Sequence, residues 1–240
     1  MPLSFALDLA MRLVLLPVLA VQALSVRKHA RKLPEPEGAR HGRGGAGPLI
    51  RVLIVGDSSA AGVGVAHQRD ALSGQIEATL GTDHDVAWRL VATSGDTTGQ
   101  TIRRLEAEEG DMFDVAVVAL GVNDVTHGVP LWRFLTNQRW LAALLRKRFG
   151  VRLLVLSSVP PMREFTLLPQ PLRWVLARQA DRFNTALRAQ SDPRADIEMI
   201  ATTFEGDGVA MAEDGFHPNG RIYQLWAQEI ARAIRARPLV

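Results

Sequence analysis

Residues 49–62 read LIRVLIVGDSSAAG, and this stretch indicates the fold of the whole chain. Its first seven residues are apolar except for Arg51, as expected of a strand that is buried on both faces of a parallel sheet. The small residues that follow predict a tight turn, from which the hydroxyl of Ser58 is exposed. Because parallel sheets bind ligands beyond the carboxyl ends of their strands, Ser58 is a candidate functional residue.

Apolar runs of strand length alternate with helical patterns along the rest of the chain. The predicted strands are 49–55, 86–92, 115–120, 152–157 and 197–201, and the predicted helices are 71–80, 100–109, 131–149, 172–190 and 221–235. Five alternations of this kind predict an α/β fold. We expect a flavodoxin-like three-layer sandwich, in which helices cover both faces of a five-stranded parallel sheet.

Two segments precede this predicted domain of residues 49–240. Residues 1–32 are apolar and end in the basic cluster Arg27, Lys28, Arg31 and Lys32. The cleanest apolar run, 13–26, is short for a membrane-spanning helix, which needs about 20 residues. The segment is a membrane anchor, an interfacial helix, a signal peptide cleaved near Ala23, or a helix packed on the domain. Residues 33–48, rich in Pro and Gly, are predicted to form a flexible linker.

The distribution of charge argues against a nucleic-acid partner. The net charge is +3, but residues 1–50 hold seven basic and three acidic groups, which leaves 21 basic and 22 acidic groups in the remainder. The basic excess therefore lies in the leader, where it fits contact with membrane lipid. We expect a bacterial protein that is membrane-associated or located in the cell envelope. The absence of cysteine excludes disulfides and thiolate chemistry.

Four short polar segments stand out. Three follow predicted strands and the fourth lies near the carboxyl terminus: Gly56-Asp57-Ser58, Ser94-Gly95-Asp96-Thr97, Gly121-Val122-Asn123-Asp124 and Asp214-Gly215-Phe216-His217-Pro218-Asn219. None is a G-x-S-x-G elbow, a phosphate loop or a dinucleotide fingerprint. Each alone is compatible with an ordinary turn, but their order and placement together are not expected by chance.

These four segments resemble conserved blocks I, II, III and V of the SGNH (GDSL-like) hydrolases. Their residues are most similar to those of the bacterial thioesterase/lysophospholipase branch. The resemblance implies the SGNH hydrolase fold and a serine esterase that cleaves acyl esters through an acyl-enzyme, without cofactor or metal.

The resemblance also implies a role for each matching residue. Ser58 is the expected nucleophile, His217 its base, and Asp214 the carboxylate that orients the imidazole. The expected oxyanion hole consists of the backbone N–H groups of Ser58 and Gly95 and the side-chain amide of Asn123. Ser59 is the alternative nucleophile. Asp57 and Asp124 are expected to be structural, because their carboxylates can bind backbone N–H groups in the active-site loops.

The substrate is less clearly indicated. Met162, Phe165, Leu167 and Leu168 follow the fourth predicted strand and form either an apolar wall for an acyl chain or a cover for the sheet. The wall would favour lipid-like or medium-chain esters. The alternatives are a carbohydrate or peptidoglycan O-acetylesterase and a membrane-tethered binding module. A metal-dependent phosphodiesterase is disfavoured, because the sequence has no H-x-H or H-E-x-x-H cluster. The sequence leaves the oligomeric state open.

Overall fold

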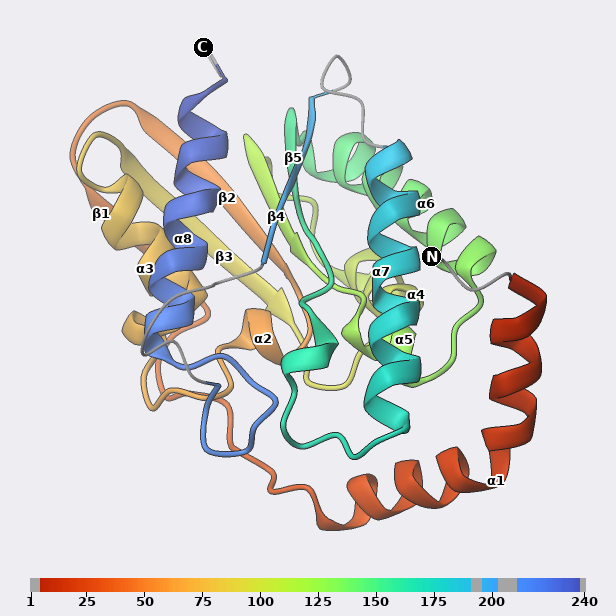
Figure 1. Cartoon of the computed structure of the whole chain (residues 1–240). Coiled ribbons are helices and arrows are strands. Elements are labelled where there is room, and N and C mark those ends of the chain that lie inside the picture. Colours follow the sequence, from red (N-terminus) through yellow and green to blue (C-terminus); the bar gives the residue numbers. More distant parts are fainter. Residues whose placement is uncertain (1–4, 191–195, 203–210, 238–240) are drawn as a thin grey trace.

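A computed structural model describes residues 5–190, 196–202 and 211–237. Within these residues six strands form one sheet, in the order β1-β3-β2-β4-β5-β6 (Figure 1). Five strands are mutually parallel: β2 (Leu49–Gly56), β3 (Asp85–Ala92), β4 (Val115–Ala119), β5 (Leu153–Ser157) and β6 (Ile197–Ile200). These are the five predicted strands, and the predicted α/β fold is confirmed.

Helices cover both faces of the sheet (Figure 1). One face carries α3 (Leu72–Leu80) and α8 (Gly220–Arg235), and the other carries α4 (Thr98–Ala107), α6 (Leu131–Phe149) and α7 (Leu172–Gln190). These five helices are the predicted ones, with ends that differ by two residues at most. Between them lie the short helices α2 (Ser58–Ala61) and α5 (Val122–Thr126) and the 3₁₀ turns η1 (Gln68–Asp70) and η2 (Met162–Glu164).

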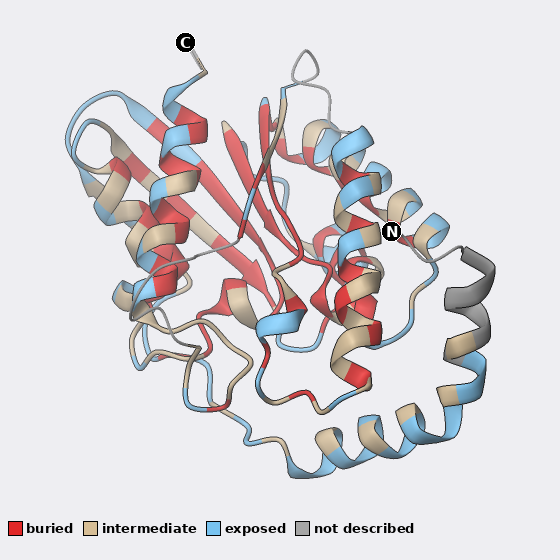
Figure 2. Ribbon diagram, in the orientation of Figure 1, coloured by how far each residue is buried: buried red, intermediate tan, exposed pale blue. Residues whose placement is uncertain are grey.

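The central strands are buried on both faces, which explains their continuous apolar sequence. In β2, Ile54 packs in the core under α3 and α8, whereas Leu53 and Val55 pack in the core under α4, α6 and α7. Side chains of a strand point alternately to opposite faces, so both neighbours must be apolar when both faces are covered. Figure 2 shows the buried sheet between its half-exposed helices.

The prediction of a flexible linker at residues 33–48 is wrong, because this segment contains strand β1 (His41–Gly45). This strand pairs antiparallel with β3 as the sixth strand of the sheet. Gly42 lies so close to the Trp88 ring that an added Cβ would stand 2.7 Å from it. Pairing of an edge strand needs only backbone groups, and the glycines let the strand approach the bulky neighbour.

The apolar leader forms helix α1 (Phe5–His29), which lies against the domain. The side chain of Gln22 donates to the carbonyl of Gln170 at 2.6 Å and accepts from the N–H of Leu172 at 3.1 Å. Leu19 and Val26 pack against the core that α7 covers. Across the described residues, we find no helix with the length and apolar character needed to cross a membrane.

Candidate active site

Ser58 stands at the carboxyl end of the central strand β2, as the first residue of α2. The chain is closely packed at Gly56, where an added Cβ would lie 2.4 Å from that of Ala60 and 2.5 Å from the carbonyl oxygen of Ala119. The Asp57 carboxylate accepts the N–H of Ser59 at 3.0 Å and caps the helix. The turn that was expected from the small residues therefore holds the Ser58 hydroxyl partly exposed beyond the sheet.

The chain folds so that His217 meets Ser58 across 159 residues of sequence. Nε2 of His217 lies 2.9 Å from Oγ of Ser58, and Nδ1 lies 2.5 Å from Oδ2 of Asp214. A serine, an imidazole and a carboxylate thus form a continuous hydrogen-bonded chain. This is the arrangement in which an imidazole can take a proton from a hydroxyl while the carboxylate orients the ring. Ser59, the alternative nucleophile, is not the residue that faces the ring.

The surroundings of Asp214 favour its ionised form, which can accept a hydrogen bond from the imidazole. Burial alone would raise the pKa of this carboxyl, whose side chain is only 2% exposed. Hydrogen bonds from the backbone N–H and ring of His217, and from the N–H of Phe216, outweigh burial and lower the pKa. Asp214 is therefore ionised near neutral pH, ready to accept the ring N–H.

The loop that carries His217 is positioned by the segment after β5. Gly215 has φ +66°, and an added Cβ would stand 2.2 Å from Oγ1 of Thr166. The N–H of Leu167 donates to the carbonyl of Gly215 at 3.3 Å, and the rings of Phe165 and Phe216 meet edge to face at 4.8 Å. Only glycine satisfies both the left-handed backbone and the close approach.

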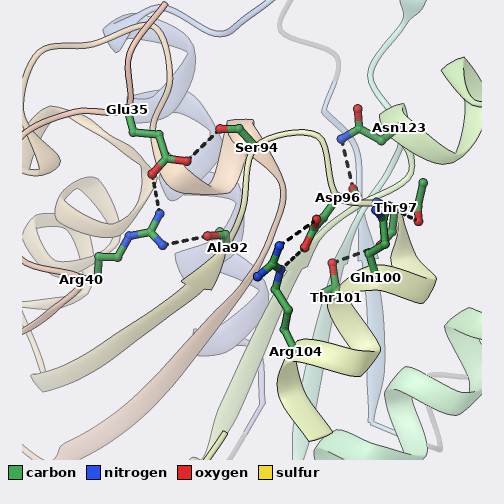
Figure 3. Close-up of polar contacts among 10 residues, drawn as sticks. All are labelled: Glu35, Arg40, Ala92, Ser94, Asp96, Thr97, Gln100, Thr101, Arg104 and Asn123. Atoms are coloured by element: carbon green, nitrogen blue, oxygen red, sulfur yellow. Dashed lines mark hydrogen bonds and ion pairs between the residues drawn. The ribbon is translucent and has the colours of Figure 1, made fainter. Parts of the chain in front are cut away.

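Gly95 and Asn123 lie on the loops that follow β3 and β4. Gly95 has φ +88°, and nothing lies within 4 Å of an added Cβ, so the space beside it is open. In the described part of the chain, the backbone N–H groups of Ser58 and Gly95 have no protein acceptor. The Asn123 amide differs, because it donates to the Asp57 carboxylate at 3.1 Å. It also donates to the carbonyl of Asp96 at 3.1 Å (Figure 3). Two of the three expected donors are therefore free in this structure, and the third is engaged.

The Gly95 loop is braced from both sides (Figure 3). Asp96, which is 5% exposed, forms an ion pair with Arg104 of α4, and Thr97 caps that helix in a reciprocal box with Gln100. On the other side Glu35 accepts from the Ser94 hydroxyl at 2.8 Å and pairs with Arg40, whose guanidinium also donates to the carbonyl of Ala92. Residues of the predicted linker thus help to hold the candidate site.

Two further carboxyls are buried beneath the loops, as the expected structural role requires. Burial, with the nearby charges of Asp124 and Asp96, raises the pKa of Asp57 to about 7 despite the hydrogen bond from Ser59. Burial likewise raises the pKa of Asp124, whose Oδ2 accepts from the N–H and the hydroxyl of Thr98, both at 2.9 Å. Asp124 therefore joins the loops of Gly95 and Asn123.

A cavity of about 430 Å³ opens beside the Ser58–His217 pair. Its lining includes both chain neighbours of Ser58, namely Asp57 and Ser59, and both chain neighbours of His217, namely Phe216 and Pro218. Most of its other walls are apolar and come from the end of β4 and the residues after it, the segment after β5, the loop before His217, and α8: Ala119, Leu120, Val122, Pro160, Pro161, Phe165, Met211, Ile222 and Trp226. The cavity has the size and character of a site for a small organic ligand.

The four residues of the predicted acyl wall differ in their surroundings. Met162, Phe165 and Leu168 are all buried in the core under α7, but of these three only Phe165 also lines the cavity. Leu167 is partly exposed and contacts the His217 loop through its backbone. The 3₁₀ turn η2 rotates Met162 inward, which a reading of composition alone cannot foresee. The sequence interpretation missed Trp226 and Phe216, although Phe216 stands beside His217 in the motif.

Among the described residues, no three His, Asp or Glu side chains lie close enough together to hold a metal ion. The residues assembled around Ser58 thus offer a hydroxyl, an imidazole, a carboxylate and free backbone donors. Their common chemistry is nucleophilic attack on an acyl carbon.

Comparisons with known proteins agree with this chemistry. The model of the GDSL-like lipase/acylhydrolase family matches residues 54–225. No curated protein matches the chain closely enough to count as a relative. A member of the lipolytic G-D-S-L family from Veillonella parvula has a similar structure, with a TM-score of 0.62 and 17% identity over 78% of this chain and 99% of that one.

Two named esterases also share the fold. The psychrotrophic esterase EstA from Pseudoalteromonas sp. has a TM-score of 0.53 and 20% identity, and the match covers 78% of this chain and 97% of that one. The acetylxylan esterase Axe2 from Geobacillus stearothermophilus has a TM-score of 0.57 and 19% identity, over 81% and 97% of the two chains. At these identities the structural matches speak for the fold.

Proposed function

This chain belongs to the GDSL-like lipase/acylhydrolase family and is a carboxylic ester hydrolase, and we propose that it cleaves medium-chain, lipid-like acyl esters with Ser58 as its nucleophile. The observation that carries this proposal is the apolar cavity beside the hydrogen-bonded chain of Ser58, His217 and Asp214. The residues of the four motif segments favour the thioesterase/lysophospholipase branch of the family.

In the proposed first half-reaction, Oγ of Ser58 attacks the carbonyl carbon of the ester while Nε2 of His217 takes the hydroxyl proton. The imidazole then gives this proton to the leaving alcohol, and an acyl-enzyme remains. Water, activated by the same imidazole, attacks the acyl-enzyme and releases the acid. Asp214 stabilises the imidazolium that forms in both halves.

The tetrahedral intermediates carry an oxyanion that needs donors already in place. The backbone N–H groups of Ser58 and Gly95 are available for it. Asn123 would supply a third donor once an amide hydrogen turns from Asp57 or Asp96 toward the substrate. Such preorganised donors supply much of the rate enhancement in acyl transfer.

The substrate preference follows from the cavity. Each methylene buried there contributes about 0.8 kcal/mol, so chains that fill it should react faster than acetate. We expect kcat/KM for p-nitrophenyl esters to rise at least about ten-fold from acetate to octanoate. A profile that favours acetate would instead indicate an O-acetylesterase and would remove the acyl-chain part of the proposal.

The nucleophile is tested separately. Ser58→Ala should lose turnover while Ser59→Ala keeps it, and an organophosphonate probe should label Ser58 of the unmodified protein. Labelling of Ser59, or turnover by a folded Ser58→Ala variant at the unmodified rate, would overturn the assignment of the nucleophile.

One substitution tests where the acyl chain binds. Glu164 is exposed and lines the cavity, so Glu164→Trp should narrow the cavity and lower kcat/KM for octanoate at least about ten-fold, with acetate hydrolysis nearly unchanged. The control is Glu106→Trp, because Glu106 is exposed on α4 and does not line the cavity. Equal chain-length profiles for the two variants would exclude this cavity as the acyl site.

A further inference from the structure

Helix α1 exposes a continuous apolar surface over residues 13–24. Its large exposed side chains include Val14, Val21 and Leu24, which are 80%, 68% and 67% exposed. The other outward-facing residues of this stretch are also apolar: Leu13, Leu16, Pro17, Val18, Ala20 and Ala23. A contiguous patch of this kind on a protein surface indicates a site of interaction.

The apolar surface cannot turn inward, because the opposite side of the helix is already bound to the domain. Gln22 is the polar residue of the stretch 13–24, and both ends of its amide are hydrogen-bonded to the segment that begins α7. Leu19 and Val26 also pack against the core. Figure 2 shows the exposed outer side of α1.

A basic cluster continues this surface at the carboxyl end of α1. Arg27, Lys28 and Lys32 are exposed, whereas Arg31 pairs with Glu213 at 2.9 Å. An apolar helix face next to exposed cations matches an anionic bilayer, in which acyl chains lie beneath negatively charged headgroups. Each cation near such a surface contributes to binding, so the apolar and the basic parts act together.

The same helix adjoins the rim of the candidate active site. Gln170, which Gln22 contacts, follows the segment that supplies Pro160, Pro161 and Phe165 to the cavity, and Glu213, which Arg31 contacts, lines the cavity itself. In Figure 1, the carboxyl-terminal part of α1 runs along the lower end of the molecule, beyond the carboxyl ends of the strands, and its amino-terminal part runs up the right side. A surface bound to α1 would therefore lie close to the cavity.

We propose that α1 docks this protein on anionic phospholipid surfaces, with its apolar face in the interface and its basic end on the headgroups. The docked orientation brings the cavity beside the lipid, from which ester substrates enter. The docking proposal does not depend on the proposed function. Only the delivery of substrate from the lipid rests on the proposed function.

Vesicle binding by the full chain tests the proposal without any need for turnover. The unmodified protein should sediment with vesicles of phosphatidylglycerol and phosphatidylcholine and much less with phosphatidylcholine alone. The triple variant Val14→Gln, Val21→Gln, Leu24→Gln should bind anionic vesicles at least about ten-fold more weakly, because it removes the apolar face while glutamine keeps the helix. The triple variant Arg27→Gln, Lys28→Gln, Lys32→Gln should lose a similar factor.

Matched controls come from α6, which also exposes apolar and basic side chains. Trp132→Gln with Trp140→Gln, and separately Arg133→Gln with Arg139→Gln and Lys147→Gln, should leave vesicle binding unchanged. Hydrolysis of a soluble p-nitrophenyl ester should be the same in all variants, which separates docking from the proposed chemistry. No binding of the unmodified protein, or equal binding by the α1 variants, would overturn the proposal. Sedimentation velocity without lipid provides a further check, since a dimer abolished by the apolar triple variant would assign the surface to a second copy of the chain instead.

Discussion

Asn123 shows most clearly how single residues shape the candidate site. Its amide is engaged by Asp57 and by the carbonyl of Asp96, so an oxyanion must compete with these acceptors. The network holds the side chain at the edge of the site, and in the proposed mechanism the amide must leave one of these acceptors before it can donate to the oxyanion.

The variant Asn123→Ala should lower kcat about 10²–10³-fold and change KM little, since the donor acts on the oxyanion of the transition state. It also leaves a buried carboxylate oxygen without its partner, so the free energy of unfolding should fall by about 1–3 kcal/mol. Activity is therefore measured well below the melting temperature. Asn137→Ala on α6 is the control, and equal kcat values for the two variants would contradict the donor role.

The raised pKa of Asp57 predicts a pH-dependent stability. The unfolded carboxyl ionises near its ordinary pKa of 3.8, whereas the pKa of the folded one is raised to about 7. Between these values the folded state binds the extra proton, so the stabilising contribution of protonation is full below about pH 4 and declines as pH rises. The slope approaches about −1.4 kcal/mol per pH unit.

Asp57→Asn removes this titration. When the pH is raised from 5 to 7, the free energy of unfolding of the unmodified protein should fall by about 2–3 kcal/mol relative to that of the variant. Urea denaturation at the two pH values measures the shift, and the exposed Glu106→Gln controls for the change in net charge. Parallel pH profiles for Asp57→Asn and the unmodified protein would show that Asp57 titrates normally.

At the scale of elements, the edge strand β1 is the part that sequence patterns misrepresented. Parallel strands in the core can be predicted from apolar runs, because both of their faces are covered. An edge strand of glycine, histidine and arginine lacks such a run and resembles a linker. Its backbone pairs with β3 all the same, and it lies over the Trp88 ring.

A substitution in β1 distinguishes strand from linker. Gly42→Val should lower the free energy of unfolding by about 1–3 kcal/mol, because its Cβ would overlap the Trp88 ring. That ring has little freedom to move, since it is 7% exposed and its N–H donates to Glu77. His41→Val, at an exposed position of the same strand, is the control. A flexible segment would tolerate both changes equally in urea denaturation.

At the scale of the whole molecule, one buried hydroxyl is among the contacts that join the beginning and the end of the domain. Tyr223 of α8, the one tyrosine of the chain, is fully buried and donates to the carbonyl of Val63 at 2.8 Å. The helix that follows the His217 loop is thereby tied to the segment that follows Ser58. The contact spans 160 residues and helps to set the two halves of the candidate site against each other.

Tyr223→Phe removes this tie without changing the packing of the ring. The buried carbonyl of Val63 loses its donor, so we expect a loss of about 1–3 kcal/mol and a fall in melting temperature of about 2–4 °C for each kcal/mol. The variant that remains folded should keep its esterase activity within a few-fold. Thermal unfolding and ester hydrolysis of the same preparation check both expectations, and an unchanged melting temperature would show that the contact is unimportant.

The sequence by itself determined the five parallel strands, their five helices and the chemical types gathered at the strand ends. These features depend on local pattern: burial on both faces demands apolar runs, and tight turns demand glycine. The four motif segments also identified which residues to compare in space, although not how they meet.

Only the tertiary structure decided the pairing of β1 with β3, the engagement of the Asn123 amide, and the composition of the cavity. Each depends on groups far apart in the chain, such as Gly42 with Trp88 or Asn123 with Asp57. Met162 and Leu168 became core residues and Trp226 a cavity residue for the same reason. Local patterns state what a residue prefers, whereas contact across the chain depends on how all the elements pack together.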